Sequence, residues 1–218
     1  MGTTLRELAP GDLPELERVF REAFGADPPK AEWTWKYVDA PFRRTSLVAV
    51  VDGRPEGFFG AWGTRYRGAG GDEPGLAAVD VMTSRAARSL GRHGVFRELA
   101  SAFFERNGAE GSPFVFGFPN DRHRKTGERL LDYVEVERCG EWERPARHAR
   151  GGFRIFRRST RESVFGRAHE PLAELLHARP GWRSDRSARL LNWRFAGRPG
   201  VRYEGVQLLD LRGRSRGY

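Results

Sequence analysis

The sequence predicts an α/β fold, in which a sheet packs against helices. Segments with the period of a β-strand, such as Ser46–Val51 and Ala77–Val81, alternate along the chain with segments whose apolar residues recur at helical spacing. Asp52-Gly53, a pair typical of tight turns, joins two predicted strands into a hairpin. Hydrophobic residues make up 39% of the 218 residues and aromatic residues 12%, which is enough apolar material for a globular core.

The predicted elements follow one another with recognisable boundaries. Asp12 and Glu15 form a capping-box pair at the start of the first helix, and Pro28-Pro29 separates that helix from the second. The glycine-rich segment Arg65–Pro74 is expected to be a flexible connection. The predicted strands are Thr4–Leu8, Ser46–Val51, Pro55–Trp62, Ala77–Thr83, Pro113–Phe118, Tyr133–Arg138 and Phe153–Phe156. The predicted helices are Leu13–Phe24, Lys30–Tyr37, Gly94–Phe104 and Asp121–Leu131.

The stretch Ala77–Phe104 joins a strand to a helix through a basic loop. The loop, Ser84–His93, carries three arginines and Gly91, and the helix begins near Gly94. The first N–H groups of a helix have no partner within the helix, and they lie at the positive end of its dipole. This order of strand, basic glycine-containing loop and helix start therefore favours an anion site.

The net charge of the chain is +9 at pH 7, and arginine supplies nearly all of it. Lysine occurs only at Lys30, Lys36 and Lys125. A basic chain suits a partner with phosphate groups or a nucleic acid, although a solvated surface rich in arginine explains the same charge.

We expect a soluble, cytoplasmic protein. Cys139 is the only cysteine, which excludes an intramolecular disulfide and a cysteine zinc cluster. The first residues lack the apolar run of a signal peptide, and no run in the chain reaches transmembrane length.

The loop and the order of the elements resemble the GNAT acyltransferases (Gcn5-related N-acetyltransferases). Their pyrophosphate-binding loop has Arg or Gln, two residues, Gly, one residue, and then Gly or Ala. Arg88 and Gly91 match this pattern, His93 stands at its last position, and Gly94 follows one place later. The order of strands and helices matches the family across residues 3–158. The resemblance implies a mixed, mostly antiparallel sheet flanked by helices.

The resemblance also implies acetyl-CoA as the acyl donor. In this family the pantetheine arm lies between the strand ending at Thr83 and the strand ending at Gly117, and Asn120 matches an Asn at the helix start beside the cofactor. The residues implied to bind the cofactor are Val81, Met82, Thr83, Arg88, Ser89, Leu90, Gly91, Arg92, His93, Gly94 and Asn120. The five histidines show no paired ligand spacing, so no metal is predicted.

Three residues are candidates for proton transfer. Asp80, on the central strand, is the candidate base, either directly or through a water molecule; a carboxylate that caps a loop or strand edge is the alternative. The family's usual general acid is a Tyr about seven residues past the Asn, where this chain has Gly127. His123 and Tyr133 are the nearby substitutes, and the alternatives are a surface histidine and a tyrosine that caps the core.

The C-terminal part repeats an earlier segment. Trp35-Lys36-Tyr37 is followed by Pro41, and Trp193-Arg194-Phe195 is followed at the same distance by Pro199. A strand and two glycines four residues apart come next in both copies. Tandem GNAT proteins, which carry such a segment in each half, are the closest resemblance.

We therefore divide the chain into a GNAT-like acyltransferase domain, residues 1–158, and a partial second GNAT-like repeat, residues 159–218. The elements predicted for the repeat are helices at Leu172–His177 and Asp185–Phe195 and a hairpin whose first strand is Tyr203–Leu209. Two interpretations of the repeat stay open. Its hairpin packs on the first domain or on another chain in a homo-oligomer, or the chain is a fragment of a longer tandem protein.

The function that these features imply is an acyl-CoA-dependent N-acyltransferase acting on an amine of a small molecule, sugar or peptide. The groove for the acceptor is expected between Trp33–Tyr37 and Arg65–Pro74. One alternative is a GNAT-fold binding module that has lost catalysis. The other is a nucleic-acid-binding protein that uses two basic runs, Arg122–Lys125 and Phe153–Arg161, although such runs are also typical of solvated faces. No membrane partner is predicted.

Overall fold

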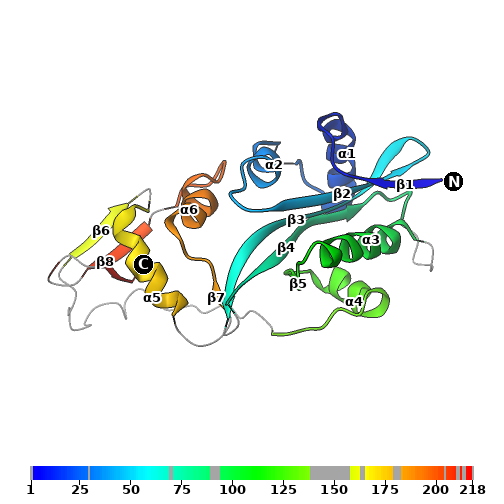
Figure 1. The fold of residues 1–218 in the computed structure, drawn as a ribbon. Helices are drawn as coiled ribbons and strands as arrows, with labels where there is room; N and C mark the ends of the chain where they lie inside the picture. The colour runs from blue at the N-terminus through cyan, green and yellow to red at the C-terminus, as the bar shows by residue number, and fades with distance from the viewer. Residues whose placement is uncertain are drawn as a thin grey trace.

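The computed structural model in Figure 1 carries one larger sheet with helices on both faces and a smaller second sheet at one end. It describes residues 2–28, 30–68, 71–88, 94–137, 158–162, 165–178, 183–203, 205–209, 212 and 215–217.

The larger sheet is mixed and mostly antiparallel. Its strands lie in the order β1 (Thr3–Arg6), β2 (Arg44–Val51), β3 (Arg54–Gly68), β4 (Gly71–Thr83) and β5 (Phe114–Phe116). Only the pairing of β4 with β5 is parallel, and the short β7 (Arg183–Ser184) pairs with the outer part of β3. The predicted fold class, a mostly antiparallel sheet flanked by helices, is confirmed.

Helices cover both faces of this sheet (Figure 1). The turn η1 (Pro10–Asp12) leads into α1 (Leu13–Phe24), which lies with α2 (Lys30–Tyr37) on one face. On the other face lie α3 (Val95–Ala109) and α4 (Asp121–Leu130). The four helices predicted for this part of the chain are confirmed, and α3 continues five residues beyond Phe104.

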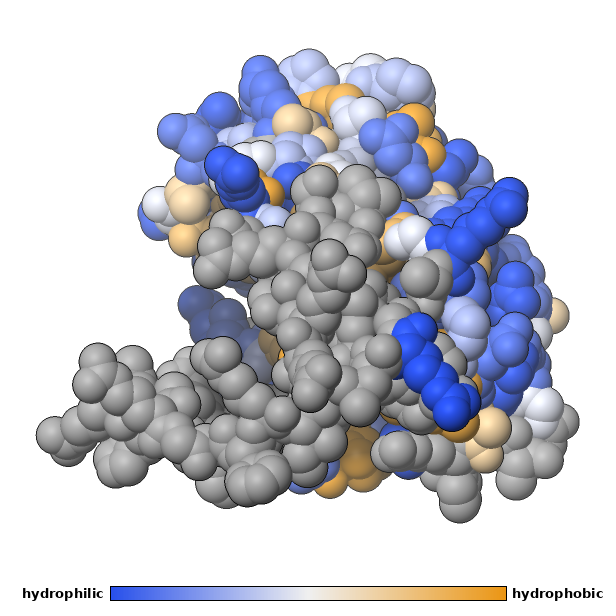
Figure 2. Space-filling model, turned by 90° about the vertical axis from the view of Figure 1, so that its left-hand side faces the viewer, coloured by the Kyte–Doolittle hydropathy of each residue, from blue (hydrophilic) through white to orange (hydrophobic). Residues whose placement is uncertain are grey.

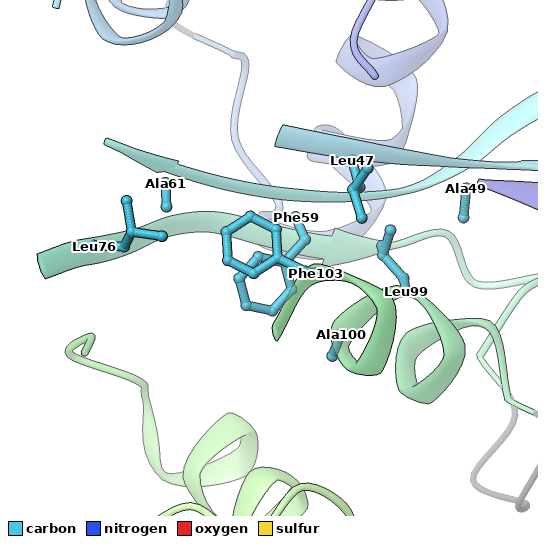
Figure 3. Packing of buried hydrophobic residues seen from close by; sticks show 8 residues of the cluster. All are labelled: Leu47, Ala49, Phe59, Ala61, Leu76, Leu99, Ala100 and Phe103. Atoms are coloured by element: carbon cyan, nitrogen blue, oxygen red, sulfur yellow. The ribbon is translucent and has the colours of Figure 1, made fainter. Parts of the chain in front are cut away.

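Alternation along the strands divides the core between the two faces. The face toward α3, drawn in Figure 3, buries Leu47, Ala49, Phe59, Ala61, Leu76, Leu99, Ala100 and Phe103. The rings of Phe59 and Phe103 stack there with their centroids 4.2 Å apart. The face toward α1 and α2 buries Leu16, Val19, Trp33, Tyr37, Val48, Phe58 and Met82. Strands β2, β3 and β4 therefore each supply both layers of the core.

The C-terminal part carries a second, smaller sheet. The second sheet has the order β6 (Arg158–Glu162), β8 (Gly205–Leu209) and β9 (Ser215–Gly217), all antiparallel. Between β6 and β8 the chain forms the turn η3 (Arg167–His169), α5 (Glu170–His177), β7, α6 (Ala188–Leu191) and the π-helical turn η4 (Asn192–Ala196). Strand, two helices and two strands also open the chain, where β1, β2 and β3 have the same antiparallel order.

The two tryptophans of the repeated motif meet in the structure. The Trp35 indole N–H donates to the backbone oxygen of Trp193 at 2.8 Å, and the Trp193 indole N–H donates to that of Trp35 at 3.0 Å. Their rings stack with centroids 4.6 Å apart, and both side chains are buried together with Ala40 and Leu190. This reciprocal contact joins α2 to η4.

Several local predictions were wrong. Asp12 does not cap α1 with its side chain; its carboxylate instead accepts hydrogen bonds from Arg6 and from the Ala9 N–H. The predicted loop Arg65–Pro74 continues β3 and β4 in its described part, because these residues keep the strand register and pack against β5 through Tyr66. Figure 2 shows hydrophilic side chains over much of the described surface in that view, which fits the explanation of the high arginine content as a solvated surface.

The C-terminal predictions need two corrections as well. Residues 133–137 form no strand, and Val134 and Val136 are exposed. The predicted helix Asp185–Phe195 begins later, at α6, because Asp185 and Ser187 form the capping turn before it. The predicted strand Phe153–Phe156 lies outside the described residues.

Replacing Trp193 by Ala should destabilise the protein by about 3–5 kcal/mol, because it removes a buried indole, its stacking on Trp35 and one hydrogen bond. Urea unfolding monitored by circular dichroism measures this change. Phe118→Ala is the control, since Phe118 is 77% exposed and its loss should change stability by at most about 0.5 kcal/mol. Equal effects of the two variants would contradict a structural role for the tryptophan pair.

Candidate active site

A β-bulge in the central strand positions Asp80. Gly60 pairs with Val79 and Phe58 with Met82, so two residues of β4, Asp80 and its neighbour, lie opposite one residue of β3. Asp80 adopts a left-handed backbone conformation, with φ of +53°, and Asp is among the residues that accept this conformation most readily. The bulge turns the carboxylate toward α2 in the middle of the sheet.

The Asp80 carboxylate is fixed by two residues of α2. The Lys36 ammonium lies 3.0 and 3.1 Å from its two oxygens, and the Tyr37 hydroxyl donates to Oδ2 at 3.0 Å. The side chains of Lys36 and Asp80 are only 15% and 12% exposed, so water screens this ion pair weakly. A cation and a hydroxyl donor together hold the carboxylate in one orientation.

Tyr37 is buried in the core between Trp33 and Phe58. Burial raises the pKa of its hydroxyl well above the usual value, and the neighbouring Asp80 charge raises it further. The phenol therefore stays protonated and serves as a hydrogen-bond donor. Gly60 makes room for it, because a Cβ atom at that position would lie 2.2 Å from the phenol oxygen.

Strand β4 continues well beyond its partner β5. Pairing between them runs from Gly75 opposite Phe114 to Ala77 opposite Phe116, and β4 then continues to Thr83. In the GNAT acyltransferases, the pantetheine arm lies between two strands that separate in this way. Of the residues implied to bind it, Val81 packs toward the α3 face, Met82 is buried on the other face, and Thr83 pairs with Gly57.

The predicted phosphate loop is described only at its two ends. Arg88 is exposed, and its guanidinium donates to the backbone oxygens of Thr83 and Glu22. Gly94 is the N-cap residue of α3, as the predicted helix start requires, and anion binding there stays a prediction. Ser89, Leu90, Gly91, Arg92 and His93 lie outside the described residues.

Asn120 begins α4. Its side-chain oxygen accepts the backbone N–H of His123 at 2.9 Å, which is the hydrogen bond of an N-cap residue. The predicted helix start at the family's Asn position is thereby confirmed. Contact of Asn120 with a cofactor stays a prediction.

His123 and Tyr133 lie together on the side of the sheet that carries α3 and α4. Their rings are stacked with centroids 5.9 Å apart, and Phe96 and Phe104 cover them. The Tyr133 ring packs on Gly127, where a Cβ atom would lie 2.2 Å from it. Burial lowers the pKa of His123 and raises that of Tyr133 to about 12.

The structure thus separates the three predicted catalytic residues into two groups. Asp80 contacts α2, whereas His123 and Tyr133 contact each other across the sheet from it. The sequence analysis missed Lys36 and Tyr37 as partners of Asp80. One signal pointed to Lys36, since it is one of three lysines in a chain that otherwise uses arginine.

The expected acceptor groove needs a correction. The side chains of Trp33, Trp35 and Tyr37 are buried and cannot line an open groove. A cavity of about 300 Å³ lies instead at the outer ends of β3 and β4, where they meet α5 and α6. Its lining residues are Phe42, Arg65, Arg67, Asp72, Glu170, Ala173, Glu174, Asp185, Ser187 and Arg189.

The first basic run belongs to the surface of α4. Arg124 pairs with Glu128 at 2.7 Å and with Glu135 at 3.4 Å, which fits a solvated helix face. The second run begins outside the described residues. Nowhere in the described ranges do three or more His, Cys, Asp or Glu side chains gather as metal ligands would. None of the helices described has both the length and the apolar character needed to cross a bilayer.

The chain resembles solved acetyltransferase structures, although no protein-family model and no curated protein matches it. AAC(6')-Iy, in complex with the bisubstrate analogue CoA-S-monomethyl-acetylneamine, aligns with a TM-score of 0.52 and 17% identity over 67% of this chain and 100% of that one. An aminoglycoside acetyltransferase from an uncultured soil metagenomic sample, in complex with sisomicin, aligns with a TM-score of 0.51 and 17% identity over 66% and 96%.

A third structure spans the whole chain. A conserved protein of unknown function from Enterococcus faecalis, described as a probable N-acyltransferase, aligns with a TM-score of 0.65 and 12% identity. The alignment covers 100% of this chain and 54% of that one, so the chain spans about half the length of the Enterococcus protein. At such identities the likeness establishes the fold, which is that of the GNAT acetyltransferases.

Replacing Gly60 by Ala should displace the Tyr37 hydroxyl from Asp80, because the added methyl group needs the space that the phenol occupies. We expect a lower urea midpoint and a loss of the Tyr37 hydrogen bond, seen as a change in ultraviolet absorption or tyrosine fluorescence. Gly11→Ala is the matched control, since a Cβ atom there meets open space. If Gly60→Ala behaves like Gly11→Ala, the close packing described here is incorrect.

The partly buried His123 should make stability dependent on pH. Its pKa in the folded state lies below the unfolded value of 6.5, so the unfolded chain binds the proton more readily. The wild type should therefore lose stability relative to His123→Gln as the pH falls from about 7 through 6.5. Urea midpoints of both proteins measured from pH 8 to pH 5 test this, and parallel curves would rule out a neutral buried imidazole.

Proposed function

We propose that the protein is an acyl-CoA-dependent N-acyltransferase that transfers an acetyl group from acetyl-CoA to an amine. The observation that carries this proposal is Asp80, a carboxylate that Lys36 and Tyr37 hold at a bulge in the central strand of a GNAT acetyltransferase fold. Structural neighbours with this fold are acetyltransferases, and one of them is in complex with a CoA bisubstrate analogue.

The residues present fit acetyl-CoA as the donor. Arg88 offers an exposed guanidinium at the beginning of the loop, and Gly94 begins α3, whose first N–H groups favour a pyrophosphate. The part of β4 beyond Ala77 has backbone amides that are not paired with β5. We assign the amides near Val81–Thr83 to the acyl arm. Bound acetyl-CoA supplies an activated acetyl group as a thioester.

The chain then has to accept one proton and supply another. The acceptor nitrogen forms its bond to the acetyl carbonyl carbon while the carbon–sulfur bond breaks, and Asp80 takes the proton that the nitrogen loses, directly or through a water molecule. Lys36 and Tyr37 hold the carboxylate in place for this step. A strand amide polarises the carbonyl oxygen.

Tyr133 is our candidate for protonating the leaving thiolate, with His123 as its partner in the stack. The support for Tyr133 is its packing on Gly127, the position at which the family usually carries its tyrosine. The raised pKa of Tyr133, about 12, keeps the hydroxyl protonated as an acid requires. The lowered pKa of His123 keeps its imidazole neutral near pH 7.

For the acceptor we propose a small-molecule amine. One neighbour is an aminoglycoside acetyltransferase in complex with sisomicin, a small molecule. The cavity at the outer ends of β3 and β4 carries carboxylates as well as arginines, a lining that suits polar groups. Its β4 residue Asp72 lies eight positions from Asp80 along the strand, so we assign the cavity only to a part of the acceptor remote from the reacting amine.

We also propose that residues 159–218 are a partial second GNAT-like repeat. The matching order of elements, the reciprocal contact of Trp35 and Trp193, and the Enterococcus protein of nearly twice the length support this assignment. Phe195 stands in the repeat where Tyr37 stands in the first copy, so the repeat has no hydroxyl for an equivalent of Asp80.

Calorimetric titration with acetyl-CoA and with CoA, at low and high salt, tests the proposal. Saturable binding at one site, accompanied by release of thiol in the presence of a panel of amines, is the expected result. Binding without thiol release would favour the GNAT-fold binding module. No binding by a folded sample would overturn the proposal.

Two variants should separate the roles of loop and carboxylate. Gly91→Val should abolish acetyl-CoA binding, because a β-branched residue blocks the close approach of the loop to the pyrophosphate, and Gly11→Val is its control.

Asp80→Asn should bind acetyl-CoA normally and lower kcat by roughly a hundredfold or more. Normal kcat in Asp80→Asn would remove Asp80 as the base.

A further inference from the structure

We propose that Arg198, in the C-terminal segment, is a positioning residue for Asp80 in the first domain. The proposal rests on the proposed function, because it assigns Arg198 to the same reaction. Arg198 lies five residues past Trp193, and it reaches Asp80 through two intermediate side chains, Glu32 and Lys36.

The four side chains alternate in charge. The Arg198 guanidinium lies 3.3 Å (Nη2) and 3.4 Å (Nε) from Glu32 Oε1. The other oxygen of Glu32 lies 3.6 Å from the Lys36 ammonium, which in turn lies 3.0 Å from Asp80 Oδ2. Glu32, Lys36 and Asp80 are 14%, 15% and 12% exposed, so the inner part of the chain is largely removed from water.

Arg198 is held in this position from several sides. Its guanidinium lies 6.0 Å from the centre of the Trp35 ring, and its Nη1 donates to the Tyr203 hydroxyl at 3.1 Å. The reciprocal hydrogen bonds of Trp35 and Trp193 fix η4 on α2. Placement of the arginine is therefore set by the contact between the repeated motifs.

Lys36 is shared between two carboxylates, and Arg198 determines how it is shared. With the guanidinium in place, Glu32 has a second cation, and the ammonium lies closer to Asp80 than to Glu32. Without it, Glu32 would compete for the ammonium with its full charge. Asp80 would then lose the cation that fixes its orientation. A change at Arg198 in the C-terminal segment would in this way alter the orientation of the candidate base in β4.

Other charged groups near this face do not substitute for Arg198. On β3, the residues beside the bulge are Phe58, Phe59 and Gly60, which carry no charge. On α1, which packs on the same face, Arg18 and Glu22 pair with each other at 2.9 Å. Among the described residues, the path to Asp80 from the C-terminal segment thus runs through Glu32 and Lys36.

The kinetic test compares Arg198→Ala, Arg198→Lys and Arg194→Ala. Arg194 is the matched control, because it has the same charge and lies in the same segment. Its guanidinium stacks on Trp62 and Phe195, whereas that of Arg198 pairs with Glu32. Arg198→Ala should lower kcat roughly threefold to thirtyfold, with the KM for acetyl-CoA unchanged. Arg198→Lys should restore much of the loss, and Arg194→Ala should retain wild-type kcat. Equal effects of both alanine variants would overturn the proposal.

A double-mutant cycle tests the same inference without turnover. The shift in urea midpoint caused by Asp80→Asn should be smaller in the Arg198→Ala background than in the wild type. In a Glu32→Gln background, Arg198 should no longer change that shift. Additive effects in the first cycle would overturn the inference even if the enzyme is active. Absence of turnover in the wild type, with coupling present, would instead refute only the proposed function.

Discussion

The buried ion pair between Lys36 and Asp80 is the constraint on which the centre of this molecule depends. A carboxylate in the middle of a sheet is strongly disfavoured unless a cation and hydrogen-bond donors compensate it. The chain provides both from the last turn of α2, and the bulge in β4 turns the carboxylate toward them. The position of α2 on the sheet, the space at Gly60 and the burial of Tyr37 all follow from this requirement.

The tryptophan pair extends this constraint to the C-terminal segment. Trp35 lies one residue before Lys36, so the same helical turn binds the candidate catalytic carboxylate on one side and η4 on the other. Stacked indoles that also exchange hydrogen bonds leave little freedom for either backbone. A disturbance in η4 would therefore act on the geometry of Asp80. The two parts of the chain form one cooperative unit at this point.

The sequence was sufficient for the fold class and for the strands and helices up to α4, because these depend on periodicity and local turns. Asp80 was singled out from its place on the central strand and Asn120 from the family resemblance, and their roles stay predictions. The partnership of Lys36 with Asp80 was not predictable in this way. It depends on how α2 crosses the sheet and on a bulge that shifts the register by one residue. Arg65–Pro74 was misjudged because glycine content suggested a loop where cross-strand pairing extends the sheet.

The packing of Tyr133 on Gly127 has an evolutionary consequence. A side chain at position 127 and the Tyr133 ring would occupy the same volume. A protein can therefore carry a tyrosine at position 127 or at position 133, but not at both. A single substitution that changes one arrangement into the other leaves either a steric clash or an unfilled space. Change at the two positions is then expected to be paired, and a search for a tyrosine at one fixed place in α4 would overlook chains of this kind.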